Sequence, residues 1–411
     1  MQTKFINNKK YRLGLLVLLI TIIGGFSWII ISVNSTFLIW IIDFITIITL
    51  FQYRRVNSSY KLIDIFLFWL LLSIVRGAYV AENYWEWKQL ITGMFSLSLP
   101  LFVYAFDKPD VVSCVLRYWL KYAISLFILL FFIMSSGAYH FYLGPVFLIG
   151  CFIPIIPKKW KYIIGGLLVI MLFIDLAARS QVIKSAVALL IALGVYYKKY
   201  VSIKLLKFIH AFCYILPIIL LYLGISGTFN IFQDLSSHEG RYVEKKVVDG
   251  QVQEEDLSAD TRTFIYIEVI ESALKHNYVI WGRTPARGND SAFFGSYNAE
   301  NLKTGKYERH SNEVCHLNVF TWLGLIGVVL YSLIYFRSSY LAVYKSNNKY
   351  IKFLGCFIAF RWAYGWIEDG NTFSILSISL WMMIGMGFSS EFRLMSDNQF
   401  KLFIKKNIYV I

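Results

Sequence analysis

The stretch ERHSNEVCHLNVFTWLGLIG, residues 308–327, passes from a polar cluster into an apolar run. Its first half holds acidic, basic and imidazole side chains. The run from Val314 onward is apolar enough to enter a membrane. Titratable groups at the rim of a bilayer form either an active site or the ordinary polar cap of a membrane helix, and the rest of the chain has to decide between the two.

The composition favours a membrane protein. The chain of 411 residues is 57% hydrophobic, 18% aromatic and only 16% charged, and its mean hydropathy is +0.57. These values are typical of an all-α polytopic membrane protein that forms a single transmembrane domain over residues 1–411, because each helix needs helical neighbours to bury its polar side chains. About twelve spans of roughly membrane length are predicted, at residues 11–33, 36–51, 61–76, 88–106, 111–134, 139–157, 161–178, 180–197, 204–224, 314–336, 350–366 and 373–392.

The basic residues predict the topology. The net charge is +15, and the Lys/Arg clusters all fall on one side of the predicted spans. By the positive-inside rule this side is cytoplasmic, so both chain ends are predicted to be cytoplasmic. The excess charge then reports topology, and binding of nucleic acid is not expected. The clusters lie at residues 4–12, 54–61, 158–161, 198–207, 337–352 and 393–406.

One long connection, about residues 225–313 between spans 9 and 10, is predicted on the outer side. Long loops in compact proteins are usually functional or disordered. Alternating polarity around Asp249-Gly250 predicts a hairpin at about 242–255, which is typical of a solvated surface feature. An amphipathic helix is predicted at about 261–278, with Asp260 as its N-cap. Its apolar residues recur at helical spacing: Phe264, Ile267, Ile270, Leu274 and Tyr278.

A few other polar residues are predicted on the outer side. Arg76 and Lys88 flank a segment whose tryptophans fit an interfacial aromatic belt. Glu368 lies between the last two spans, beside Asp369.

Arg179 lies on a tight turn between spans 7 and 8. An arginine there needs an anionic partner, because an unpaired charge near hydrocarbon is unfavourable. That partner is either an internal carboxylate, Asp175 or Glu368, or a phosphate of a substrate.

The order of these features resembles the O-antigen polymerase and O-antigen ligase family of bacterial membrane glycosyltransferases. The resemblance is carried by the turn AARSQ (177–181), by Arg262 in DTRTFIYIE, by the turn WGRTPARG (281–288), and by the polar motif before LGLIG (323–327). It is strongest over residues 175–330, and the N-terminal third matches only in hydropathy.

The resemblance implies a reaction at the periplasmic face of the bacterial cytoplasmic (inner) membrane. A sugar chain on undecaprenyl diphosphate is transferred to an acceptor hydroxyl, without a metal or another cofactor. Arg179, Arg262, Arg283 and Arg287 are then the candidates that bind the diphosphate, since the guanidinium fork suits phosphate oxygens. The implied partners are the undecaprenyl-diphosphate-linked oligosaccharide, a chain-length regulator and a flippase.

The acceptor hydroxyl needs a base or an oriented hydrogen bond. A helix beginning at Ser311 as N-cap would place Asn312, Glu313 and His316 on one face, with His310 just before it. The ligases of the family usually carry a His-Asn pair here, but Ser311 fills the histidine position. The catalytic role therefore stays open among His310, Glu313 and His316, with weaker substrate contacts expected from Asn312, Arg76, Lys88 and Glu368.

The sequence thus predicts a polymerase of lipid-linked oligosaccharide repeat units, making O-antigen, capsule or exopolysaccharide. The runner-up is the ligase that transfers the finished chain to lipid A–core, which the altered His-Asn pair disfavours. A lipid-linked oligosaccharide flippase is the alternative of another class. Transporters commonly contain internal repeats, and the two halves of this chain show no convincing repeat, which disfavours the flippase.

Overall fold

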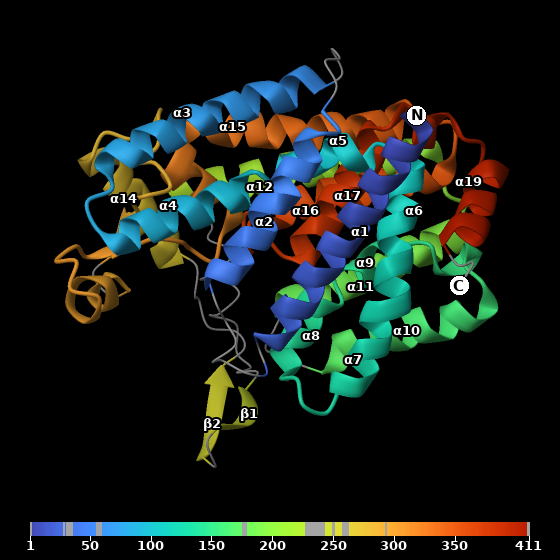
Figure 1. Ribbon diagram of the computed structural model, residues 1–411, viewed down its shortest axis with the longest axis horizontal. Helices are drawn as coiled ribbons and strands as arrows, with labels where there is room; N and C mark the ends of the chain where they lie inside the picture. The colour runs from blue at the N-terminus through green and yellow to red at the C-terminus, as the bar shows by residue number, and fades with distance from the viewer. Residues whose placement is uncertain are drawn as a thin grey trace.

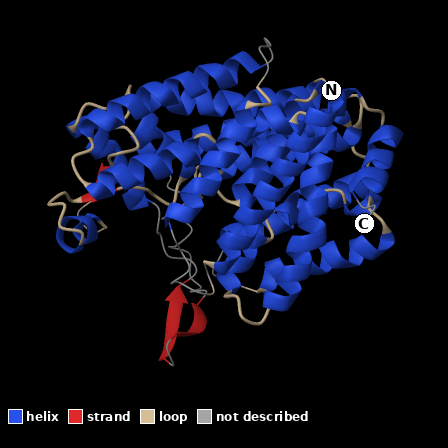
Figure 2. Cartoon of the chain, in the orientation of Figure 1, coloured by secondary structure: helices blue, strands red, loops and turns tan. Residues whose placement is uncertain are grey.

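A computed structural model gives the fold (Figure 1). It describes residues 2–27, 29, 36–54, 60–174, 179–226, 243–248, 251–256, 263–291 and 294–408. Helices make up most of these residues (Figure 2). The elements are α1 (Gln2–Phe26), α2 (Thr36–Phe51), α3 (Lys61–Val80), α4 (Tyr84–Leu97), η3 (Leu99–Leu101), α5 (Phe102–Phe106), α6 (Pro109–Tyr118), η4 (Trp119–Ala123), α7 (Ile124–Leu130), α8 (Ser136–Tyr142), α9 (Pro145–Gly150), η5 (Ile153–Ile155), α10 (Lys158–Phe173), α11 (Arg179–Tyr196), α12 (Ile203–Ile225), β1 (Val243–Val248), β2 (Gln251–Asp256), α14 (Thr263–Lys275), β3 (Asn289–Asp290), η6 (Tyr297–Asn301), β4 (Glu308–Arg309), α15 (Cys315–Tyr344), α16 (Lys349–Tyr364), α17 (Ile375–Phe388), α18 (Ser390–Leu394), α19 (Asp397–Phe403) and η7 (Ile404–Ile408).

Six helical segments among the described residues are long and apolar enough to cross a membrane. They are α3, α4 to α5, α6 to α7, α11, α12 and α15. Helix α12 turns large apolar side chains outward, with Ile218 58% and Tyr222 70% exposed, as expected of a helix that faces lipid. The chain is therefore a helical membrane-embedded protein. A total of about twelve spans remains a prediction.

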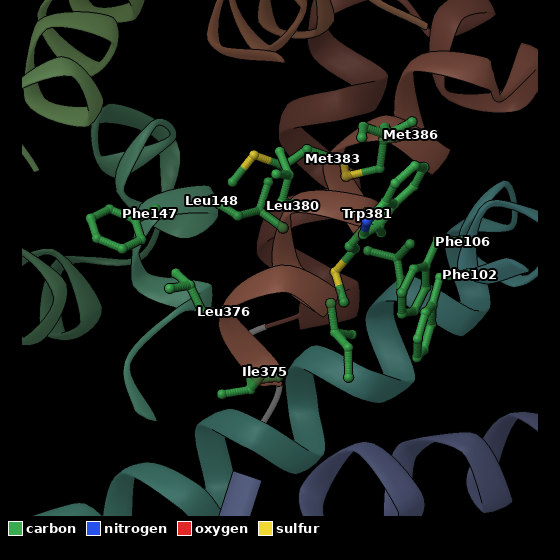
Figure 3. Close-up of a cluster of buried hydrophobic side chains, with 14 of the residues drawn as sticks. Phe102, Phe106, Phe147, Leu148, Ile375, Leu376, Leu380, Trp381, Met383 and Met386 are labelled. Atoms are coloured by element: carbon green, nitrogen blue, oxygen red, sulfur yellow. The ribbon is translucent and has the colours of Figure 1, made fainter. Parts of the chain in front are cut away.

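Helix α17 lies near the middle of the bundle (Figure 1). All of its residues are buried, which explains why its sequence is apolar all round. Trp381 is fully buried, and the α17 side chains lie between Phe102 and Phe106 of α5 on one side and Phe147 of α9 on the other (Figure 3). Because a large core of this kind fixes the neighbouring helices, it also fixes the loops at their ends.

The predicted span at 139–157 is not one continuous helix. This stretch contains the short helices α8 and α9 and the 3₁₀ turn η5. The break between the two helices falls at Gly144, where an added Cβ would lie only 2.5 Å from Leu376 Cα of α17. Pro145, which has no N–H to donate, then begins α9. The close crossing of α17 thus explains the break.

One end of the bundle, which we call the basic end, gathers the predicted Lys/Arg clusters. Lys198 Nζ lies 2.5 Å from an Asp397 carboxylate oxygen, and the Asn347 N–H donates to the carbonyl of Arg393. The first turns of α1 and the helix α19 are both at this end, away from α14 (Figure 1). The structure therefore brings together basic segments that are distant in the sequence.

The opposite end, which we call the loop end, contains α14, β3 and β4. Helix α14 packs inward through Ile265 and Val269, which are buried. Of the apolar residues that the sequence predicts at helical spacing, Tyr278 is buried, and the other four are each at least 38% exposed: Phe264, Ile267, Ile270 and Leu274. An exposed apolar stripe on a helix beside lipid-facing α12 is typical of a helix lying in the membrane interface.

Strands β1 and β2 pair antiparallel where the sequence predicts a hairpin. Their register runs from Val243 opposite Asp256 to Val248 opposite Gln251, which leaves a two-residue connection. Several predicted features lie outside the described residues: Asp175, Asp249-Gly250, Asp260 and Arg262.

Helix α15 is broken at Gly324, whose φ of 68° and ψ of −170° are not helical. The segment 279–284 runs beside the break. The Leu325 N–H donates to the carbonyl of Val279 at 2.8 Å, and the Thr284 N–H donates to that of Trp322 at 3.1 Å. Trp69 of α3 donates its indole N–H to the carbonyl of Leu323, which also lies at the break. Irregular backbone in a membrane helix requires partners of this kind from the protein.

Candidate functional site

The polar motif at residues 308–316 enters α15 differently from the prediction. The prediction that Ser311 caps the helix is wrong, because α15 begins at Cys315 with Val314 at the N-cap position. The first N–H groups of the helix are satisfied by the connection between α16 and α17: Cys315 donates to Glu368 O and His316 to Gly365 O, both at 3.2 Å. Backbone carbonyls thus take the place that a Ser311 side chain would fill.

Asparagines connect the motif to the surrounding loop. Asn312 Nδ2 donates to Asn289 Oδ1 of β3 at 3.1 Å. The Asn312 backbone and the Asn318 side chain exchange two hydrogen bonds, of 2.6 and 2.7 Å. Asn318 also donates to the Asp369 carboxylate. Asn312, predicted as a substrate contact, therefore fixes the loop against α15.

Glu368 joins this network to α11. Its carboxylate lies 2.5 Å from Lys184 Nζ and accepts a hydrogen bond from Gln181 at 3.3 Å. Burial alone would raise the pKa of Glu368, but Lys184 and Arg361 more than offset it and hold that pKa below its ordinary value. Glu368 is thus an ionised group in the connection between α16 and α17, and it contacts the first turns of α11.

Arg179 is the first residue of α11. Its side chain is exposed, and it forms no hydrogen bond or ion pair with any other described residue. Of the two internal partners predicted for it, Glu368 is occupied by Lys184 and Asp175 lies outside the described residues. Arg179 is therefore a cation at the loop end for which the described part of the chain supplies no counter-ion.

Asp369 is a candidate that the predicted site did not include. It accepts hydrogen bonds from the Asn371 N–H at 2.9 Å and from the Asn318 side chain, yet burial raises its pKa to about 6. A carboxylate with a pKa near neutrality suits general acid–base chemistry. Its position next to Glu368 in the last connection was the one sequence signal available.

The pKa of Asp369 predicts a pH-dependent stability. Because the folded state holds this proton more tightly than the unfolded chain, the free energy of unfolding falls as pH rises from about 4 to 6. The loss totals about 3 kcal/mol, and it persists above pH 6. Asp369→Asn, which keeps an acceptor oxygen, should melt higher than wild type at pH 7.5 and lose this advantage at pH 4. If the difference in melting temperature between the two proteins stays constant from pH 4 to pH 7.5, the pKa of Asp369 is not raised.

His316 is fully buried. Its Nε2 lies 3.0 Å from the carbonyl of Trp362, so Nε2 carries the proton and donates. The ring packs against Trp366, with centroids 4.5 Å apart, and Nδ1 has no partner in the described part of the chain. The His316 side chain is thus covered by the rings of Trp362 and Trp366 and does not reach solvent.

The other two candidates for the base differ in exposure. Glu313 is 55% exposed and lies 3.6 Å from Arg309. His310 is partly buried, and burial lowers its pKa below the ordinary value, so its imidazole is neutral at neutral pH. A neutral imidazole can accept a proton, which makes His310 the better-suited base of the two.

Arg283 and Arg287 form an internal ion-pair cluster with Glu308, which is 6% exposed. Arg287 Nε donates to Glu308 at 3.0 Å, and Arg283 Nη2 lies 3.0 Å from the same carboxylate. Arg283 Nη1 also donates to Asp290 at 3.0 Å. Burial alone would raise the pKa of Asp290, but Lys275, His276 and Arg283 lower it to about 2. Both arginines, predicted to bind diphosphate, thus have carboxylate partners within the loop.

The two remaining cations also differ. Arg76 donates to the carbonyls of Trp281 and Gly282 at 2.9 and 3.1 Å, so it attaches α3 to the segment beside the helix break. Lys88 lies with Nζ 5.2 Å from the centroid of the Trp85 ring, and it has no carboxylate partner in the part of the chain that the structure describes. Lys88 and Arg179 are therefore the two predicted cations whose side chains form neither a hydrogen bond nor an ion pair with the part of the chain that the structure describes.

Comparison with known proteins leaves the resemblance to the O-antigen family untested. No protein-family model matches the sequence, and neither a curated protein nor a solved structure is significantly similar to it. In the described residues, no group of three or more His, Cys, Asp or Glu side chains is placed to hold a metal ion. The fold and the site therefore define this chain as a helical membrane protein with a polar network at its loop end.

Proposed function

We propose that this chain is a membrane glycosyltransferase that polymerises undecaprenyl-diphosphate-linked oligosaccharide repeat units at the periplasmic face of a bacterial inner membrane. The motifs that resemble the O-antigen polymerase and ligase family support this proposal. In the reaction, the acceptor hydroxyl attacks the anomeric carbon of the donor sugar. The bond to the diphosphate breaks, undecaprenyl diphosphate leaves, and the hydroxyl proton passes to a base.

Arg179 is the observation that carries the proposal. An exposed cation at the rim of a membrane bundle, without a counter-ion among the described residues, is suited to hold an anionic substrate group. The ion pair of Lys184 and Glu368 lies one turn away and keeps the start of α11 in place. A fixed cation stabilises the charge that develops on a leaving diphosphate. Lys88 is the second cation available for this role, and Arg262 remains a prediction from the sequence.

Two groups are suited to receive the proton of the acceptor hydroxyl. His310 is neutral because burial lowers its pKa, and Asp369 has a pKa of about 6. Arg283 and Arg287 take a positioning role, since they hold the loop through Glu308.

The proposal predicts a large effect of Arg179→Ala on polymerisation. Purified protein in lipid nanodiscs is incubated with undecaprenyl-diphosphate repeat units, and the products are separated as a ladder. Loss of one charge-stabilising group should slow laddering by about 100-fold or more. Arg12→Ala is the matched control, because Arg12 is an exposed arginine at the basic end, and it should keep wild-type turnover. Full laddering by Arg179→Ala at normal expression would refute the diphosphate role.

Two extensions of this assay separate the alternatives. With lipid A–core added as acceptor, transfer of a chain to it without lengthening of the lipid-linked units would identify a ligase. In closed liposomes, which separate two aqueous compartments, movement of the lipid-linked units across the bilayer without a new glycosidic bond would identify a flippase. One observation favours the flippase: broken helices such as α15 are common in transporters. In α15, however, the backbone N–H and C=O groups freed at the break form hydrogen bonds with segment 279–284 and with Trp69. In transporters such groups face a substrate instead.

A further inference from the structure

A second site lies at the basic end, far from the network described above. A groove of about 1000 Å³ opens there between the first and the last helices of the chain. Its walls come from α1, α6, α18, α19 and η7. No step of the proposed reaction uses it.

Positive charge predominates around the groove. Its lining includes the cations Lys10, Arg117 and Lys406 and the carboxylates Asp110 and Glu391. Lys10 and Asp110 form an ion pair 3.5 Å long, and the Asp110 side chain is 49% exposed. Such an exposed pair is weak. Further exposed cations, Lys401 and Lys405, lie on the same terminal segment as Lys406.

The groove also exposes apolar surface. Tyr11, Leu394 and Leu402 line it, and each is at least half exposed. Exposed apolar side chains next to lysines are typical of the membrane interface, where long cationic side chains reach the headgroups while apolar ones contact acyl chains. An occupant must therefore carry negative charge at one end and hydrocarbon at the other.

We propose that this groove binds one anionic phospholipid from the leaflet at the basic end. The headgroup phosphate lies among Lys10, Arg117 and Lys406, and an acyl chain covers Leu394 and Leu402. Because the walls come from both terminal segments of the chain, the bound lipid joins α1 to α19 and stabilises the folded protein. This inference is independent of the proposed glycosyltransferase activity.

Native mass spectrometry of the purified protein, titrated with phosphatidylglycerol or phosphatidylcholine of the same acyl chains, tests the proposal. Wild type should bind one phosphatidylglycerol in preference to phosphatidylcholine. Lys10→Gln/Arg117→Gln/Lys406→Gln should weaken this binding by about 100-fold, at about fivefold for each cation removed near a membrane surface. The control Lys158→Gln/Lys159→Gln/Lys204→Gln removes the same charge from exposed lysines outside the groove and should bind as wild type does.

The opposite change keeps the test decisive if the triple variant fails to fold. Asp110→Asn/Glu391→Gln removes the two carboxylates of the groove and should tighten the binding of phosphatidylglycerol. Equal losses in the groove variant and the lysine control would overturn the proposal, since they indicate diffuse attraction. Equal binding of the two lipids by wild type, or no retained lipid, would also overturn it.

Discussion

Gly324→Ala is expected to abolish stable folding of the loop end, at a cost of at least about 3 kcal/mol. The φ of 68° and ψ of −170° at Gly324 lie in a region that residues with a Cβ rarely adopt. A Cβ built there would also lie 2.2 Å from Ile280 O and 2.4 Å from Gly282 N, both of them backbone atoms. The segment 279–284 would have to leave the break, which exposes unpaired groups of α15 in the membrane.

The measurement is the yield of monodisperse protein after detergent extraction, together with its melting temperature. Gly166→Ala in α10 is the matched control, since nothing lies within 4 Å of its added Cβ. In a helix this control should be neutral or stabilising by up to about 1 kcal/mol. Similar melting of the two variants would show that Gly324 is not constrained.

Glu308→Gln is expected to lower the free energy of unfolding of the loop end by about 3–5 kcal/mol, because it leaves the partly buried Arg287 without its carboxylate partner and Arg283 with Asp290 alone. Glu308 accepts hydrogen bonds from Arg287 and from the Gly288 N–H, and it pairs with Arg283. Burial alone would raise the pKa of Glu308, but these partners hold it below the ordinary value. The variant should show faster hydrogen exchange over residues 283–309.

Glu271→Gln is the control for this prediction, because Glu271 is exposed on α14, and it should change stability by less than about 0.5 kcal/mol. A triple variant that adds Arg283→Gln and Arg287→Gln to Glu308→Gln should recover part of the loss, since no unpaired charge is then buried. If the triple variant is less stable than Glu308→Gln alone, the unpaired arginines are not the cause.

Hydropathy predicted most helices well, because apolar backbone in a membrane has to satisfy its hydrogen bonds within a helix. The predicted span 204–224 corresponds to α12, Ile203–Ile225. Hydropathy did not predict the break within 139–157, which lies where α17 crosses at Gly144. A contact between segments more than 200 residues apart leaves no trace in local hydropathy.

The candidate site was predictable in its location and less so in its contacts. Topology placed the polar motif, Glu368 and Arg179 at the same end of the bundle, and the Cys315–Glu368 hydrogen bond joins two of these regions. The pairing of Arg287 with Glu308 depends on strands β3 and β4, which are too short to leave a sequence pattern. The reaction, the substrate and the catalytic roles remain predictions from the resemblance.

The break in α15 has a consequence for biogenesis. The ribosome makes segment 279–284 before α15, and α3 earlier still, so both partners of the break already exist when α15 enters the membrane. Until they meet, the groups that α15 frees at Gly324 are better satisfied if the nascent helix stays continuous. We therefore expect α15 to kink and the loop to dock together, after α15 has been inserted.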